Sequence, residues 1–76
     1  MEKQKFLLSV VNDIRLNKQM ESLSEIHDTD RLREDLGFTS FDLAELTVKI
    51  EDEYDIDIFE DGLVNTIGEI LSKLED

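Results

Sequence analysis

Residues 35–54 read DLGFTSFDLAELTVKIEDEY and predict a turn that leads into an amphipathic helix. Gly37 favours the turn because a residue without Cβ reaches positive φ at little cost. Thr39 and Asp42, three positions apart, have the form of a capping box, in which each side chain accepts a backbone N–H of the other residue. We therefore expect Thr39 to cap the helix and Ser40 to be its first residue.

The helix that follows has an apolar face and an acidic face. The positions that recur at spacings of three and four predict a packed stripe, formed by Leu43, Leu46, Ile50 and Tyr54. The acids that lie away from the centre of this stripe, and that we expect to face solvent or a partner, are Asp42, Glu45, Asp52 and Glu53.

Ser40 has two interpretations. Serine is common at helix starts because it satisfies backbone N–H groups, so Ser40 could be only a capping or solvent-exposed residue. If Thr39 supplies the cap, however, the hydroxyl of Ser40 is left free. Unpaired backbone N–H groups and the positive end of the helix dipole favour an anion in the first turn, so a phosphate attached to Ser40 would be well placed.

These residues resemble the signature of the acyl carrier proteins, Leu-Gly-x-Asp-Ser-Leu-Asp followed by Glu-Leu and an acidic helix end. The matching residues here are LGFTSFD at 36–42, Glu45 with Leu46, and EDEY at 51–54. The resemblance covers nearly the whole chain, because length, acidity and helix order also fit. It implies that Ser40 accepts 4′-phosphopantetheine, whose terminal thiol carries acyl groups as thioesters.

Three residues depart from the pattern of the acyl carrier proteins. Thr39 replaces the aspartate that usually precedes the serine, and Phe41 replaces the usual leucine. Lys49 adds a base to a helix that is normally uncharged or acidic at this point. These changes favour a carrier for a specialised lipid, polyketide-like or other secondary pathway over one for housekeeping fatty-acid synthesis.

The remaining chain predicts an all-α fold. Helical periodicity over residues 2–17 indicates a first helix. Residues 18–38 read as a long ordered loop, either with or without a helical turn near residues 30–35. We expect a short or frayed helix at residues 59–64, and a last helix capped by Asn65 or Thr66 with a buried stripe of Ile67, Ile70, Leu71 and Leu74. The prediction is a small four-helix bundle like the acyl carrier proteins, with three main helices, one short helix and a long first loop.

The composition describes one small, acidic domain, residues 1–76. The chain has 20 acids and 8 bases, a formal net charge of −12, which argues against nucleic-acid binding and favours basic protein partners. It has no cysteine, and no dedicated metal pattern is present; His27 reads as an ordinary loop residue. No stretch approaches the roughly 20 apolar residues of a membrane helix, so we expect a cytoplasmic monomer that does not enter membranes.

We expect the central helix to dock partners. The seven acids at residues 51–61 occur without one base, which is more than solubility requires, although a merely solvated face is the alternative. Ala44 and Val48 follow Ser40 at spacings of four and offer small apolar contacts, unless they are partly buried against the loop. The candidate docking residues are Thr39, Phe41, Asp42, Ala44, Glu45, Val48 and Asp52.

The functional hypothesis is a stand-alone acyl carrier protein with no catalytic activity of its own, for fatty-acid, polyketide-like or specialised lipid biosynthesis. The partners that the resemblance implies are a phosphopantetheinyl transferase, acyl-loading enzymes, and acyl-transferring or elongating enzymes with basic docking surfaces. One alternative is an aminoacyl or peptidyl carrier, which has the same modified serine. The other is an unmodified acidic protein-interaction module, which intact mass would separate from both carriers.

Overall fold

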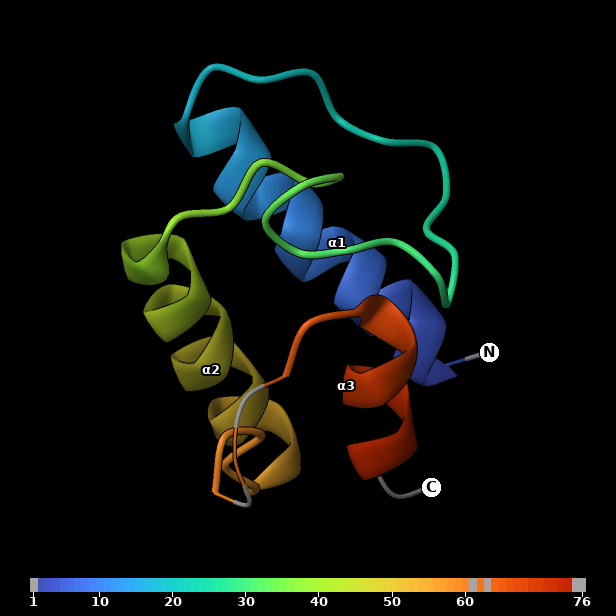
Figure 1. Ribbon diagram of the computed structural model, residues 1–76, viewed down its shortest axis with the longest axis vertical. Helices are drawn as coiled ribbons and strands as arrows, with labels where there is room; N and C mark the ends of the chain where they lie inside the picture. The colour runs from blue at the N-terminus through green and yellow to red at the C-terminus, as the bar shows by residue number, and fades with distance from the viewer. Residues whose placement is uncertain (1, 61, 63, 75–76) are drawn as a thin grey trace.

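Three helices form the framework of the part of the chain that the computed structural model describes, residues 2–60, 62 and 64–74. They are α1 (Glu2–Asn17), α2 (Ser40–Tyr54) and α3 (Ile67–Lys73). Figure 1 shows α1 crossing behind the other two, with α2 and α3 on opposite sides of the molecule. The predicted starts of all three helices are confirmed, because α1 begins at Glu2 and capping boxes precede both α2 and α3.

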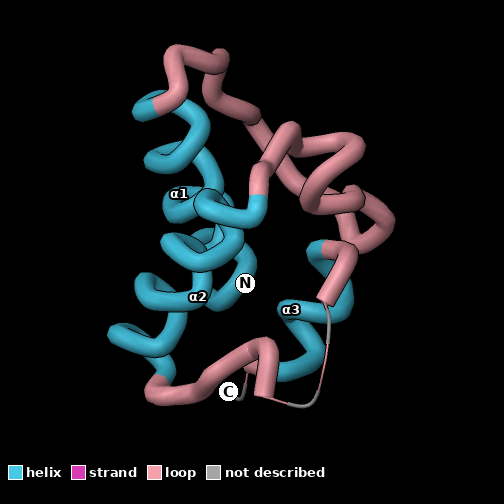
Figure 2. Tube along the Cα trace, turned by 60° about the vertical axis from the view of Figure 1, so that its left-hand side comes forward, coloured by secondary structure: helices cyan, strands magenta, loops and turns pink. Residues whose placement is uncertain are grey.

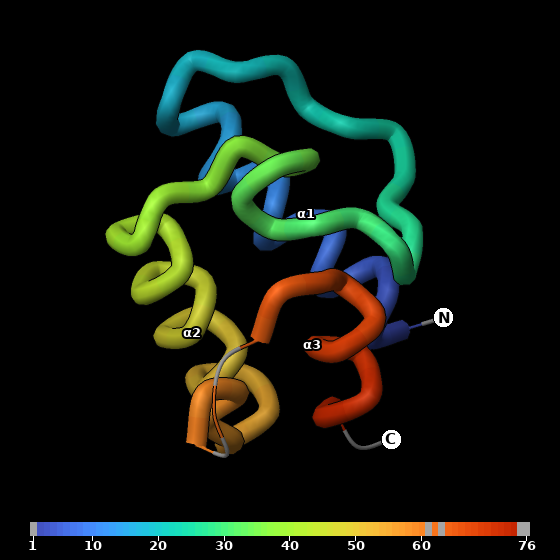
Figure 3. The backbone as a smooth tube through the Cα atoms, in the orientation of Figure 1, coloured from blue at the N-terminus to red at the C-terminus, as the bar shows by residue number. Residues whose placement is uncertain are grey.

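Residues 18–39 connect α1 to α2 and pass the start of α3 on the way (Figure 3). An isolated β-bridge joins Arg31 to Thr66, and the backbone N–H of Ile67 donates to the carbonyl of Asp30 at 2.9 Å. Residues 31–36 then form a turn, in which the N–H of Asp35 donates to the carbonyl of Arg31 at 2.9 Å. Figure 2 shows this segment as loop between helices, and its backbone bonds hold it against α3.

Gly37 follows that turn with φ of 77°, as the sequence predicts for a residue that reverses the chain before α2. Two bases, Arg15 in the last turn of α1 and Lys18 just after it, hold the reversal in place. Arg15 is buried and donates to the carbonyl of Leu36 at 2.7 Å. Lys18 donates to the carbonyl of Gly37 at 2.7 Å. The end of α1 therefore fixes where α2 begins.

The short helix predicted at residues 59–64 is not found among the described residues of that segment, while residues 61 and 63 lie outside them. α2 ends at Tyr54, and the following residue, Asp55, caps it with a left-handed φ of 59°; residues 58–60 form a turn. The N–H of Phe59 donates to Oδ1 of Asp57 at 2.9 Å, a local side-chain bond that competes with helix formation. Gly62 has φ of 133°, which a right-handed helix does not accommodate.

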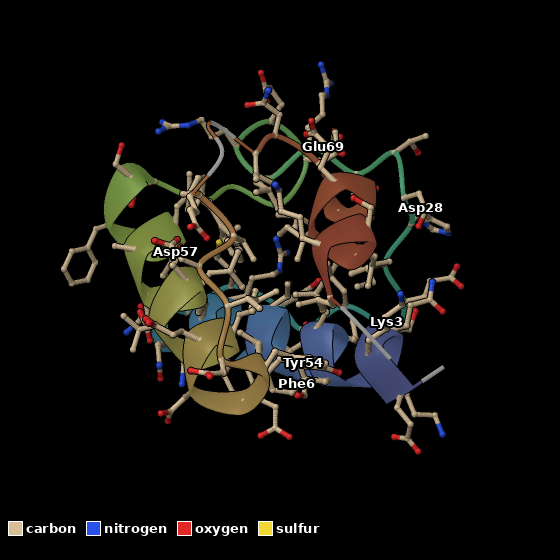
Figure 4. All side chains as sticks on the ribbon, turned by 90° about the horizontal axis from the view of Figure 1, so that it is seen from below. Lys3, Phe6, Asp28, Tyr54, Asp57 and Glu69 are labelled. Atoms are coloured by element: carbon tan, nitrogen blue, oxygen red, sulfur yellow. The ribbon has the colours of Figure 1, made fainter. Side chains whose placement is uncertain are left out.

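One apolar core joins the helices and the loops. The stripe of α3 is buried as predicted, and so are three of the four predicted positions of α2, Leu43, Leu46 and Ile50. The fourth, Tyr54, is half-buried and packs on Phe6 of α1 with ring centroids 5.3 Å apart (Figure 4). The connecting segments contribute further buried side chains, namely Ile26, Leu32, Leu36, Phe38, Ile58 and Val64.

Candidate functional site

Ser40 is the first residue of α2, and its side chain is exposed. The cap is formed by its neighbours, because the N–H of Asp42 donates to Oγ1 of Thr39 at 3.3 Å and the N–H of Thr39 donates to Oδ2 of Asp42 at 2.9 Å. Both halves of the predicted capping box are therefore present. The hydroxyl of Ser40 is not used in this cap, so it is available at the positive end of the helix dipole.

A guanidinium lies directly beside this hydroxyl. Nη2 of Arg33 donates to Oγ of Ser40 at 2.8 Å. Arg33 belongs to the turn at residues 31–36, which the N–H of Phe38 closes by donating to the carbonyl of Leu32 at 3.0 Å. Arg33 was not predicted from the sequence. Its only signal there is a base seven residues before the serine, and the path of the turn determines that the two side chains meet.

Asp42 was expected from the sequence to face solvent or a partner, and this prediction is wrong. Its side chain is buried, and Lys18, which follows α1, donates a hydrogen bond to its Oδ2. Burial by itself would raise the pKa of Asp42, but the hydrogen bonds from Lys18 and from the backbone and hydroxyl of Thr39 outweigh it and hold the pKa below its ordinary value. Periodicity put Asp42 beside the stripe, and the contact with Lys18 draws it inward.

The other candidate docking residues of α2 remain at the surface. Phe41 is 78% exposed and Val48 is 63% exposed, which is unusual for large apolar side chains. Ala44 is also exposed, so the alternative that Ala44 and Val48 are partly buried against the loop is wrong. The remaining candidates are Thr39 and Asp52, which are exposed, and Glu45, which is half-buried.

Acidic side chains continue along α2 beyond this apolar group. The exposed acids in the described part of residues 51–60 are Glu51, Asp52, Glu53, Asp55, Asp57 and Glu60. Asp61 lies outside the described residues. Within the part of the chain that the structure describes, no cluster of three or more histidines, cysteines or acids could hold a metal ion. The surface at α2 thus combines exposed apolar side chains near Ser40 with a run of acids towards the C-terminal end.

A cavity of about 360 Å³ lies between the turn at residues 31–36, α2 and the segment before α3. Arg33 and Leu43 line it together with Val64 and Asn65 from the segment before α3. Arg33 therefore contacts Ser40 and lines this cavity at the same time.

None of the helices in residues 2–60, 62 and 64–74 is long and apolar enough to cross a membrane.

A helical bundle with an exposed serine opening its second helix is typical of small carrier domains. A family model for the phosphopantetheine attachment site matches residues 16–74, and the chain belongs to this family. The comparisons with curated proteins and with solved structures gave no match. The match confirms the resemblance to the acyl carrier proteins, because their domain is of this kind.

Members of this family carry a covalently attached 4′-phosphopantetheine and act as carriers, not as catalysts. The protein is therefore a phosphopantetheine-carrying carrier protein that works with modifying and cargo-handling enzymes. The residues at the start of α2 fit such a group. They offer an exposed hydroxyl that could form the ester, a guanidinium 2.8 Å from that hydroxyl that could pair with a phosphate, and the free N–H groups of a helix N-terminus.

Proposed function

We propose that the protein is an acyl carrier protein and that Ser40 is the residue to which its 4′-phosphopantetheine is attached. The observation that carries this assignment is the exposed hydroxyl of Ser40, which opens α2 but takes no part in the cap. When bound, the group supplies a terminal thiol that holds acyl cargo as a thioester. The chain itself supplies the attachment point and the surface that partners contact.

The other serines are less suited to attachment. Ser9 and Ser72 lie within helices, and each hydroxyl donates to a carbonyl three residues earlier at 2.8 Å. Ser22 and Ser24 are exposed but lie in the connecting segment, away from any helix start. Only Ser40 combines exposure with the N–H groups and dipole of a helix N-terminus.

The assignment is tested by intact mass after co-expression with a phosphopantetheinyl transferase of broad specificity. The wild-type chain should gain one phosphopantetheine, and Ser40→Ala should gain none while its circular dichroism stays close to wild type. Ser22→Ala is the matched control, an exposed serine that we expect to be dispensable. Normal loading of Ser40→Ala, or loss of loading in Ser22→Ala, would show that the attachment site lies elsewhere.

Acyl cargo is favoured over aminoacyl or peptidyl cargo by the residues before the site. Aminoacyl and peptidyl carriers more often have Gly-Gly at this point, whereas here Gly37 is followed by the buried Phe38. The cargo can be read from the mass of the loaded protein purified from cells that contain its own partner enzymes. A fatty or polyketide-like acyl group supports the proposal, and an amino acid on the thiol would replace it with the aminoacyl alternative.

Partner docking is proposed for the exposed side of α2. A basic partner surface would meet the acids Glu45 and Asp52, while Phe41, Ala44 and Val48 would supply apolar contact close to Ser40. Thr39 borders this area, and Asp42 is left out because it is buried. Enzymes that load, elongate or transfer acyl groups are the partners that this surface fits, and we place the protein in the cytoplasm as a monomer.

A further inference from the structure

Arg33 donates to a neutral hydroxyl, whereas two other bases near the start of α2 pair with carboxylates. Arg31, two residues earlier, pairs with Asp35 at 3.2 Å, and Lys18 pairs with Asp42. In the described part of the chain, the partner of the Arg33 guanidinium is Oγ of Ser40 at 2.8 Å, with no carboxylate in ion-pair range. A guanidinium has five N–H donors in a planar fork, so one bond to a hydroxyl leaves most of them unused.

The position of Arg33 is also unfavourable for docking if nothing neutralises it. The proposed partner surface is basic, and a free guanidinium next to Ser40 would repel it. An anion attached to Ser40 removes this conflict, because the guanidinium would then be paired within the protein. The charge of Arg33 is thus better matched to the modified serine than to the free one.

We propose that Arg33 is a positioning residue, which binds the phosphate of the group attached to Ser40 and holds the first part of the arm against the turn at residues 31–36. This inference rests on the proposed attachment at Ser40. Esterification places phosphorus one bond beyond Oγ and the free phosphate oxygens two bonds beyond it, within reach of a guanidinium that already donates to Oγ. Arginine binds phosphate through two parallel N–H bonds, which fix direction as well as distance.

The structure leaves room for this contact. Arg33 is exposed and lines the cavity of about 360 Å³, so its side chain can turn from Oγ to a phosphate without displacing the core. Phe41 lies on the exposed side of α2 and is 78% exposed. A phosphate held by Arg33 therefore directs the arm towards the turn and leaves Phe41 uncovered for partners.

Thermal unfolding and ³¹P NMR of the loaded protein test the proposal without measuring any partner activity. Wild type, Arg33→Gln, Arg33→Lys and Arg31→Gln are each loaded to completion with excess transferase and checked by intact mass. Arg31→Gln is the matched control, since it removes the same charge from the same turn and cavity wall, but from a guanidinium that is paired with Asp35 and not with Ser40. The quantities compared are the change in Tm on loading and the ³¹P chemical shift of the phosphodiester.

Loading should raise Tm by about 1–5 °C more in the wild type than in Arg33→Gln, the range expected for an exposed ionic contact in a domain of this size. Arg31→Gln should behave as wild type in both measurements. Arg33→Lys should keep part of the Tm difference because it keeps the charge, but its ³¹P shift should move towards that of Arg33→Gln because the paired N–H bonds are lost.

The outcomes separate this proposal from the one on which it rests. If the wild type gains no mass at Ser40, the attachment assignment fails and the role of Arg33 fails with it. If all variants load but show the same Tm change and the same ³¹P shift, the positioning role is overturned while the attachment site stands. Equal effects of Arg33→Gln and Arg31→Gln would also overturn it, because general charge rather than a contact would then explain them.

Discussion

Lys18 donates a hydrogen bond to the carboxylate of Asp42, a residue 24 positions later in the chain. The same ammonium group donates to the carbonyl of Gly37, so one side chain ties the end of α1 to both the turn and the start of α2. Asp42 meanwhile accepts the N–H of Thr39 within the capping box. The start of α2, where Ser40 lies, is therefore held by contacts from two directions.

The first prediction is that Asp42→Asn lowers the free energy of unfolding by about 1–2 kcal/mol at neutral pH, since it removes the ion pair and weakens the cap. The pKa of Asp42 is lowered in the folded protein, so its contribution is complete above the unfolded pKa, near 3.8, and is lost as the pH falls through the folded pKa. Chemical unfolding should show a difference between the two proteins that is constant near pH 7 and shrinks below about pH 4. A difference that grows on acidification would contradict this assignment.

The parts of the fold that were predicted correctly depend on local patterns. The helix starts follow from capping residues and from periodicity, both of which act over a few neighbouring positions. The burial of Asp42 and the contact of Arg33 with Ser40 were missed because each depends on the path of residues 18–39. The helix expected at residues 59–64 is not found among the described residues of that segment for a local reason, namely that the side chain of Asp57 bonds the backbone of the turn and Gly62 has positive φ.

A second prediction concerns the exposed ring of Phe41. Phe41→Ala should weaken binding of a partner enzyme by about tenfold, because exposed aromatic side chains near the centre of an interface often contribute more than 1 kcal/mol. Its free energy of unfolding should change by less than about 0.5 kcal/mol, since the ring is 78% exposed. Kd from titration calorimetry with the transferase measures the first effect, and thermal unfolding measures the second.

Leu16→Ala is the control for Phe41→Ala. Leu16 is another large apolar side chain at the surface, 56% exposed, but it lies near the end of α1. Its replacement should leave the Kd unchanged if binding uses α2. Equal weakening in both variants would mean that apolar exposure in general, and not the position of Phe41, governs binding.

The third prediction is that added salt stabilises the fold. The formal net charge of −12 on 76 residues produces repulsion among exposed acids, and salt screens it within a Debye length of about 10 Å at 0.1 M. Tm measured by circular dichroism should rise between about 0.01 and 0.5 M sodium chloride. A Tm that stays flat or falls over this series would show that charge repulsion does not limit stability.

The last prediction tests whether the acids of α2 attract partners at their position or only through net charge. Glu45→Lys and Asp52→Lys each change the charge by two on α2, whereas Asp28→Lys makes the same change beside α3, away from the start of α2 (Figure 4). If a basic enzyme docks on α2, the KM for modification of Ser40 by the transferase should rise several-fold in the first two variants and little in the third, because opposite charges across an interface steer association.

The dependence on salt makes this test sharper. Screening should reduce the wild-type advantage over Glu45→Lys and Asp52→Lys, so their KM values should converge with that of the wild type as ionic strength rises. Circular dichroism should show that all three variants are folded, since substitutions at exposed or half-buried surface positions change stability little. Equal losses in the three variants would assign steering to net charge alone, and no loss in any of them would remove the acids of α2 from the docking surface.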